Sequence, residues 1–295
     1  MKYKTAAAFR QALEERLRQW SLGRNQALTR LRKMVAFDRF LARLEKCDPE
    51  AWVVKGGFAL QLRLANRART TKDVDVAVTK DWTPEQVSTQ LRKAVRMNIR
   101  DWFEFEVGEP TEAATGAPRG GFRFPVRGLL DGRSFETFHM DVAQGDPISD
   151  APERITVPNL LSFAGIRSAT VRCYPLTAQV AEKLHAYTRA YSGGATSRVR
   201  DLVDILLAAS ISKFSSSRLR RAVHATFQAR RTHNLPDKMP EPPANLVPPY
   251  RKLARDFNLP WPTIKEAGSA AACLLNPILQ GNAARKWDPL AWKWK

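Results

Sequence analysis

Cysteine is too sparse in this chain for a disulfide framework or a structural zinc site. Three cysteines, Cys47, Cys173 and Cys273, are spread over 295 residues without a CxxC spacing, which indicates a reducing compartment. Residues 1–46 are too polar and charged for a signal peptide. The chain also lacks an apolar run near the roughly 20 residues that cross a bilayer. We therefore expect a cytoplasmic protein that does not enter a membrane.

Acidic residues are scarce relative to basic ones. Twenty-nine Asp and Glu stand against 48 Lys and Arg, which gives a net charge of +19. Such an excess favours an anionic partner, with nucleic acid ahead of an anionic membrane surface or an acidic protein. The hydrophobic fraction of 44% suffices for a sizeable core, so a largely disordered chain is excluded.

Hydrophobic periodicity predicts an α/β (α+β) fold with a mixed sheet in residues 1–150. Two amphipathic helices open this domain, within residues 9–20 and 28–45. The expected strands cover residues 52–54, 74–78, 102–107, 121–126 and 135–142, and helices are expected at 58–64 and 84–97.

Residues 151–295 are expected to form a mainly helical C-terminal domain, after a proline-rich hinge at 145–158. The helices are predicted at 176–189, 199–209, 217–230 and 267–275. Eight prolines between residues 236 and 262 predict an extended or turn-rich segment.

The C-terminal part also holds much of the positive charge. From residue 213 to 295, fifteen Lys and Arg stand against five Asp and Glu. The tail at 285–295 interleaves basic residues with tryptophans, and two interpretations are open. Its side chains bind phosphates and stack on bases of RNA, or its tryptophans dock on the protein's own surface.

The stretch from residue 52 to 78 carries the pattern most specific to a function. Gly56 and Gly57 stand between a short strand and a helix, where backbone amides and the positive helix end approach a phosphate. Asp73 and Asp75 share one face of the next strand, about 6–7 Å apart. That spacing suits one or two divalent cations, and the alternative is a pair of exposed strand residues without a function.

A third carboxylate, Asp141, ends a later strand that is expected to lie beside the first two acids. In two-metal phosphoryl transfer, two acids bridge both ions and a third holds the ion that activates the attacking hydroxyl. Asp131 and Asp146 lie in turns and are weaker candidates for this position. His139, on the same strand as Asp141, is interpreted as structural.

These elements, in this order, resemble the DNA polymerase β-type nucleotidyltransferase superfamily. More narrowly, Lys-Gly-Gly at 55–57 and Arg-Thr-Thr-Lys-Asp-Val-Asp at 69–75 resemble the AbiEii/AbiGii toxin family, which includes the MenT-type toxins of toxin–antitoxin systems. Glu-Lys-Leu-His at 182–185 and Arg-Val-Arg-Asp-Leu-Val-Asp at 198–204 resemble later motifs of that family.

The resemblance implies roles for residues of this chain. The residues implied at the nucleotide are Gly56, Gly57, Arg69 and Thr71, and those implied at a two-ion magnesium site are Asp73, Asp75 and Asp141. Lys183 would neutralise charge as pyrophosphate leaves, although a solvated helix lysine is the alternative. Asp201 would complete the site, and Asp204 shares its helical face. Arg200 stands where the family often has lysine.

The function implied by the resemblance is magnesium-dependent transfer of a nucleoside monophosphate from an NTP to RNA. The expected acceptor is the 3′ end of tRNA, modification of which blocks translation, and the expected protein partner is a cognate antitoxin. A protein or small-molecule hydroxyl is an alternative acceptor. A non-catalytic, basic RNA-binding protein on the same fold is the alternative of another class.

Overall fold

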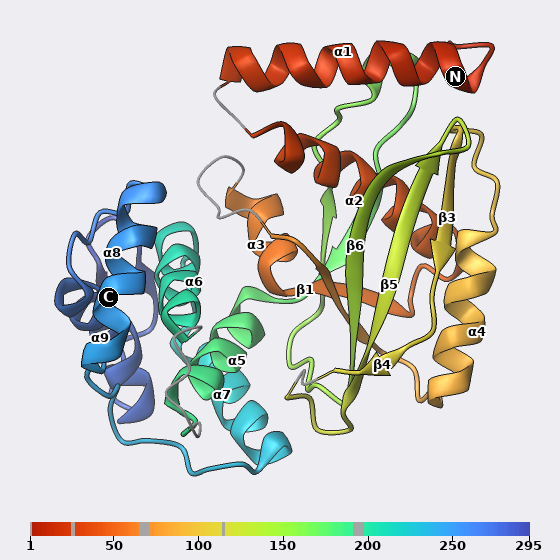
Figure 1. Cartoon of the computed structure of the whole chain (residues 1–295). Helices are drawn as coiled ribbons and strands as arrows, with labels where there is room; N and C mark the ends of the chain where they lie inside the picture. The colour runs from red at the N-terminus through yellow and green to blue at the C-terminus, as the bar shows by residue number, and fades with distance from the viewer. Residues whose placement is uncertain (1, 25–26, 65–70, 114–115, 191–197) are drawn as a thin grey trace. The chain divides into compact units, whose positions relative to one another are not determined.

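A computed structural model describes residues 2–24, 27–64, 71–113, 116–190 and 198–295 of the chain. The chain divides into two compact units, whose elements are labelled in Figure 1. Unit 1 comprises Met1–Leu62, Thr70–Gly145 and Glu153–Cys173, and unit 2 comprises Arg63–Arg69, Asp146–Pro152 and Tyr174–Lys295. The division expected at residue 150 does not coincide with these units, because residues 153–173 belong to unit 1.

In the described residues, unit 1 is built on a mixed sheet, as the sequence predicts, with eight strands where five were expected. Its strands are β1 (Trp52–Lys55), β2 (Val74–Val78), β3 (Phe103–Val107), β4 (Thr111–Glu112), β5 (Gly121–Leu130), β6 (Arg133–Gln144), β7 (Glu153–Thr156) and β8 (Thr170–Cys173). The order across the sheet is β3-β5-β6-β2-β1-β8-β7, and β4 pairs with β5. The pairs β2–β6 and β1–β8 are parallel, and the others are antiparallel.

Strands β7 and β8 lie in residues 151–175, where the sequence did not predict strands. They pair with each other, and β8 also pairs with β1, on the side of β1 that is opposite to β2. Each has only four residues, and Ile155 is the single apolar residue of β7, which leaves the sequence with a weak strand signal. Strands β5 and β6 are longer than expected because they continue to a tight hairpin turn, where Asp131 and Gly132 both have positive φ.

Helices α1 (Ala6–Arg24), α2 (Leu28–Cys47) and α4 (Pro84–Val95) supply apolar residues to the core of unit 1. Alternation along the strands buries one sheet face, on which Phe138 of β6 packs against Phe37 and Phe40 of α2, with ring centroids 4.9 and 5.3 Å apart. The intervening residues, Arg123 and His139 among them, are exposed on the opposite face. That polar face carries the candidate site.

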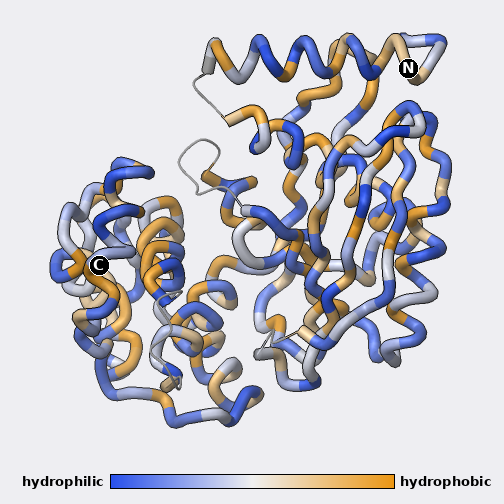
Figure 2. The backbone as a smooth tube through the Cα atoms, viewed as in Figure 1, coloured by the Kyte–Doolittle hydropathy of each residue, from blue (hydrophilic) through white to orange (hydrophobic). Residues whose placement is uncertain are grey.

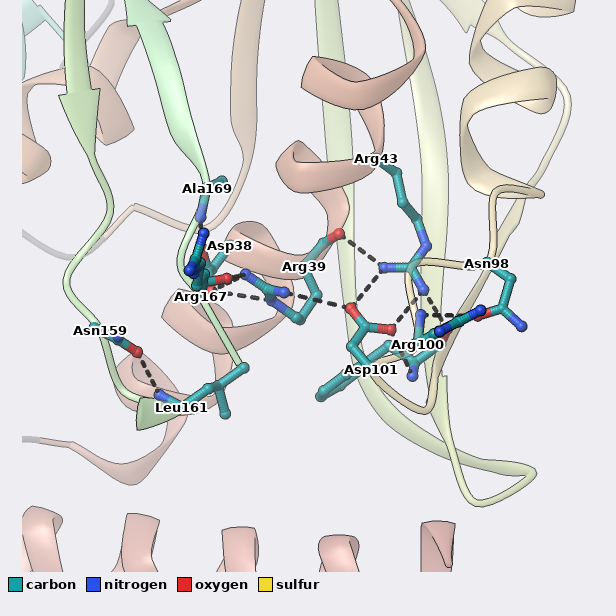
Figure 3. Close-up of polar contacts among 11 residues, drawn as sticks. Asp38, Arg39, Arg43, Asn98, Arg100, Asp101, Asn159, Leu161, Arg167 and Ala169 are labelled. Carbon is teal, nitrogen blue, oxygen red and sulfur yellow. Dashed lines mark hydrogen bonds and ion pairs between the residues drawn. The ribbon is translucent and has the colours of Figure 1, made fainter. Parts of the chain in front are cut away.

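Buried ion pairs connect α2 to the rest of unit 1 (Figure 3). Arg43 donates to both carboxylate oxygens of Asp101, at 3.0 and 2.8 Å. Arg39 donates to Asp38 at 2.7 Å, and Asp38 also accepts from the backbone N–H of Ala169 at 2.7 Å. Burial raises the pKa of Asp38 to about 6, against the opposing effect of Arg39.

Unit 2 is mainly helical, as expected, and its apolar helix α6 is orange in Figure 2. Its elements are α5 (Leu176–Thr188), α6 (Arg198–Ile211), α7 (Ser216–Arg230), α8 (Val247–Asp256), α9 (Ile264–Leu279), β9 (Trp287–Asp288) and β10 (Lys293–Trp294). No helix in the described part of the chain is long and apolar enough to cross a membrane.

Helix α8 corrects the prediction for residues 236–262. It forms inside the proline-rich segment because Pro248 and Pro249 occupy its first turn, where a missing N–H breaks no helical hydrogen bond. Helix α9 extends beyond the predicted 267–275, and a capping box between Thr263 and Glu266 starts it.

The tryptophans of the tail dock on unit 2 itself, which decides between the two interpretations of this segment. Trp287 is buried, and its indole N–H donates to the carbonyl of Ala209 at 2.9 Å. Trp292 and Trp294 donate in the same way to carbonyls of α9, at 3.0 and 2.9 Å. The three rings also pack on one another, with centroids 5.3 and 5.6 Å from Trp287. The docked rings therefore stabilise the fold of unit 2.

Candidate active site

The glycine pair opens helix α3 (Gly56–Leu64) directly beside a candidate metal ligand. Gly56 has φ +62°, and a Cβ at this position would lie 2.0 Å from Oδ2 of Asp75. Glycine is therefore required both for the backbone conformation and for the space that the carboxylate fills. Gly57, the next residue of the helix, is buried. The sequence predicts a phosphate at this glycine pair, and the structure places the Asp75 carboxylate against it.

A row of charged residues crosses four strands at this point. Asp75 of β2 is the register partner of Lys55 on β1 and of Asp141 on β6, and Asp141 is in turn the partner of Arg123 on β5. Residues directly opposite one another in a sheet project from the same face. The row thus reads cation, acid, acid, cation, and the predicted adjacency of Asp75 and Asp141 is confirmed.

Arg123 holds Asp141 through two hydrogen bonds. Its Nε and Nη2 donate to the two carboxylate oxygens, both at 2.7 Å. The hydrogen-bonded Asp141 raises the pKa of Arg123 above its usual range, and the charges of Asp73 and Asp75 act in the same direction. Arg123 is therefore a counter-cation that acts on all three acids, in addition to Lys55 in the same row. Its side chain is 44% exposed, whereas that of Asp141 is 14% exposed.

Asp73, directly before β2, and His139 of β6 form a second polar pair, which lies two residues along the chain from Asp75 and Asp141. Nδ1 of His139 lies 3.4 Å from Oδ1 of Asp73. Half of the His139 side chain is exposed, so this residue is not part of the core. A hollow of about 620 Å³ adjoins the pair, and its lining includes the basic side chains of Lys33, Lys72 and Arg127. Asp73 and His139 are themselves among the residues that line this hollow.

The donor chemistry of the three acids fits a hard divalent cation, which prefers carboxylate oxygens. Asp75 and Asp141 lie on neighbouring strands, which are about 4.8 Å apart, and Asp73 lies two residues before Asp75. Within the described residues, however, no group of three acid, His or Cys side chains is gathered as a metal site. Arg123 occupies both oxygens of Asp141, so full coordination by this acid requires Arg123 to release it.

Unit 2 gathers the later candidates around Lys183 of α5. Its Nζ lies 2.9 Å from Oδ1 of Asp201 and 3.1 Å from Oδ2 of Asp204, both on α6. Arg198 also pairs with Asp201, at 2.7 Å. The side chain of Asp204 is fully buried, that of Asp201 is 8% exposed, and that of Lys183 is 19% exposed. Both acids hold the lysine, and Asp201 lies nearer to solvent.

Thr71 and Arg69 are the other residues that the sequence predicts at the nucleotide. Thr71 is buried, and its hydroxyl donates to the carbonyl of Asp73 at 3.1 Å, so it braces the start of β2. Arg69 lies outside the described residues. The sequence interpretation missed Lys55 and Arg123 as members of the site. Lys55 directly precedes the glycine pair, which is a signal for it, whereas Arg123 joins the site only through strand pairing.

Comparison with known proteins gives a family and a fold. The sequence profile of the nucleotidyl transferase AbiEii toxins of type IV toxin–antitoxin systems matches residues 39–267. Among solved structures, MenT4, a nucleotidyltransferase toxin from Mycobacterium tuberculosis H37Rv, is similar with a TM-score of 0.63 and 21% identity, over 95% of this chain and 92% of that chain. The search of curated proteins found no match.

Other similar structures have lower scores. JHP933 from Helicobacter pylori has a TM-score of 0.43 and 16% identity, over 84% of this chain and 94% of that chain. An antigenic nucleotidyltransferase-like protein from Paracoccidioides brasiliensis has a TM-score of 0.42 and 17% identity, over 68% of this chain and 92% of that chain.

The profile match covers most of the chain and includes the acids of β2 and β6, the glycine pair and the lysine cluster. The fold is that of MenT4 over nearly the whole length of both chains. The chain belongs to the AbiEii family of nucleotidyltransferase toxins of type IV toxin–antitoxin systems.

Proposed function

We propose that this nucleotidyltransferase toxin transfers a nucleoside monophosphate from an NTP to the 3′-terminal hydroxyl of tRNA, with magnesium as its cofactor. The charged row across the sheet carries the proposal, because it sets Asp75 and Asp141 in register beside the start of α3. Asp73, two residues away, lines a hollow whose other charged residues are Lys33, Lys72, Arg127 and Glu106. The net charge of +19 supports an RNA acceptor, and the toxin–antitoxin family implies an antitoxin as protein partner.

In this reaction the acceptor hydroxyl loses its proton to water, and its oxygen forms a bond to the α-phosphorus of the NTP. The bond from that phosphorus to the β-phosphate oxygen breaks, and pyrophosphate leaves. Bound magnesium would supply Lewis-acid stabilisation of the charge on the phosphates, with Asp73, Asp75 and Asp141 as its ligands. The start of α3 at Gly56 and Gly57 contributes a positive helix end toward the triphosphate.

The lysine cluster of unit 2 has a separate role in the proposal. Lys183 neutralises negative charge that develops on the β- and γ-phosphates as pyrophosphate leaves. Asp201 and Asp204 fix its ammonium group from two sides, which removes rotamer freedom before substrate binds. Thr71 and Arg69 belong to the segment that leads into β2 and shape the phosphate end of the site.

The test is incubation of the purified protein with each α-³²P-labelled NTP, magnesium and total RNA. Wild type should label RNA of tRNA size at its 3′ end, and Asp73→Asn or Asp75→Asn should reduce the rate by about 100-fold or more. Glu104→Gln is the matched control, since it neutralises an exposed acid on the same sheet and should leave labelling unchanged.

Three outcomes would contradict the proposal. Label on protein or on a small molecule, with none on RNA, would reject the RNA acceptor. Full activity without a divalent cation would reject the magnesium site. Growth inhibition that survives Asp73→Asn would identify a non-catalytic, RNA-binding toxin, because this acid is partly exposed and its neutralisation should cost little stability.

A further inference from the structure

The C-terminal segment of unit 2 forms a ribbon that brings distant basic residues onto one surface. Strand β10 pairs antiparallel with β9, and Lys286 next to β9 forms an antiparallel bridge with Ser215 before α7. The backbone N–H of Trp287 donates to the carbonyl of Phe214 at 2.9 Å, and that of Ser216 donates to the carbonyl of Arg285 at 3.1 Å. Residues 213–216, 285–288 and 293–295 therefore lie side by side.

Alternation along this ribbon separates an apolar side from a charged side. Phe214 and Trp287 are buried, and Trp294, the partner of Trp287, sends its indole N–H to the carbonyl of Leu274. The residues that flank these aromatics project the other way, and the lysines among them are exposed. We call the exposed lysines of this outer side the basic ribbon: Lys213, Lys286, Lys293 and Lys295.

Further cations border the basic ribbon, and acids are scarce in it. Arg285, directly before Lys286, is exposed, and the guanidinium of Arg220 on α7 packs over the turn at Gly281. In residues 212–221 and 281–295 the only acid is Asp288, which forms an ion pair with Lys295. That lysine holds the pKa of Asp288 at about 2, so the acid stays ionised and balances one charge of the group.

The ladder also forces two lysines together. Lys286 and Lys295 exchange both backbone hydrogen bonds, at 2.8 and 2.7 Å, which makes them direct cross-strand neighbours. Like charges directly opposite each other destabilise a sheet. The inward tryptophans hold the ribbon in place despite this repulsion, and a bound polyanion would relieve it.

We propose that the basic ribbon binds the phosphate backbone of RNA. This surface offers ammonium and guanidinium groups without exposed aromatic rings, since its tryptophans are turned inward. It is therefore suited to phosphates and not to base stacking, and its contacts should be independent of base sequence. The proposal rests on the proposed function in one respect, namely that the acceptor is RNA; the contact itself requires no catalysis.

The test measures RNA affinity by fluorescence anisotropy at several salt concentrations, with the full chain and a labelled tRNA. The variant Lys213→Gln/Lys286→Gln/Lys293→Gln removes three lysines of the ribbon and leaves the Lys295–Asp288 pair. Its affinity should fall by about 10- to 50-fold near 150 mM salt, and the slope of log K against log salt should decrease by about 2. Lys238→Gln/Lys252→Gln/Lys265→Gln is the matched control, because it removes three exposed lysines elsewhere in unit 2.

Each result has a defined meaning. Unchanged affinity in the ribbon variant, or an equal loss in the control variant, would overturn the proposal. Binding of polyglutamate in place of RNA would assign the ribbon to an acidic protein and also overturn it. A thermal melt identifies any variant that fails to fold, and single Lys286→Gln then replaces the triple. If wild type binds RNA through the ribbon but labels none, the proposed function fails and the ribbon remains.

Discussion

Replacing Arg123 by glutamine should strengthen the binding of divalent cations to this protein. Arg123 donates to both oxygens of Asp141, the acid that pairs in register with Asp75. A cation that uses Asp141 must compete with this guanidinium and is also repelled by its charge. Glutamine is shorter than arginine, but its amide N–H can donate from the position of the Arg123 Nε, and it removes the charge.

The size of the effect follows from the exposure of the pair. Two unit charges 4 Å apart interact by about 1 kcal/mol in water and about 4 kcal/mol at an effective dielectric constant of about 20. Since 44% of the Arg123 side chain is exposed, the lower part of this interval applies. We expect a gain of about 1–2 kcal/mol, which is about 5- to 30-fold in affinity.

The assay is titration of the nucleotide-free protein with Mn²⁺, in which electron paramagnetic resonance follows the unbound ion. The control is Arg127→Gln, which removes a second arginine of β5 that pairs with Glu106 on the neighbouring strand. This control should bind Mn²⁺ within about twofold of wild type. If Arg123→Gln binds Mn²⁺ as tightly as wild type or more weakly, Arg123 does not compete with the cation for Asp141. Its role would then be to hold the Asp141 carboxylate in position.

Three further predictions concern the supports of the site and the core. Gly56→Ala should lose Mn²⁺ binding and lower the unfolding free energy by about 1–3 kcal/mol in thermal melts, because the new Cβ meets the Asp75 carboxylate and φ is positive there. The control is Gly23→Ala, where nothing lies within 4 Å of the new Cβ, and it should be neutral or stabilising. Asp204→Asn should lower the unfolding free energy by about 1–3 kcal/mol, because it leaves Lys183 beside a fully buried neutral group. The loss should exceed that of Asp201→Asn, and equal losses in denaturant titrations would contradict this prediction. The folded state should bind a proton on Asp38 more tightly than the unfolded state, since burial raises its pKa from 3.8 to about 6. The contribution of this group to stability should therefore fall as pH rises from about 4 to about 6, by up to about 3 kcal/mol, and Asp38→Asn should abolish that slope in melts compared across pH.

The local chemistry of the site was accessible from the sequence because it depends on short-range order. The alternation of β2 places Val74 and Val76 on the buried face and Asp75 on the other face. The spacing of three residues places Asp201 and Asp204 on one face of α6. The mixed sheet and the helical second half followed from periodicity in the same way.

Strand register was beyond the sequence, because a single bulge changes it. Counting back from the Asp131-Gly132 turn pairs Arg123 with Met140, which faces the core. The register shifts by one residue between Gly128 and Leu129, and this shift brings Arg123 opposite Asp141. The counter-cation of the site therefore exists only in the folded sheet.

The C-terminal segment shows the same division between local pattern and tertiary structure. Its basic and tryptophan-rich sequence allowed either stacking on RNA or docking on the protein. Backbone carbonyls at Ala209, Ala270 and Leu274 accept the three indole N–H groups, and they come from helices far away in the sequence. The sequence by itself determined that basic residues and tryptophans alternate in this segment. The packing of α6 and α9 decided that the tryptophans turn inward and leave the lysines outside, because buried indoles require both apolar contacts and an acceptor.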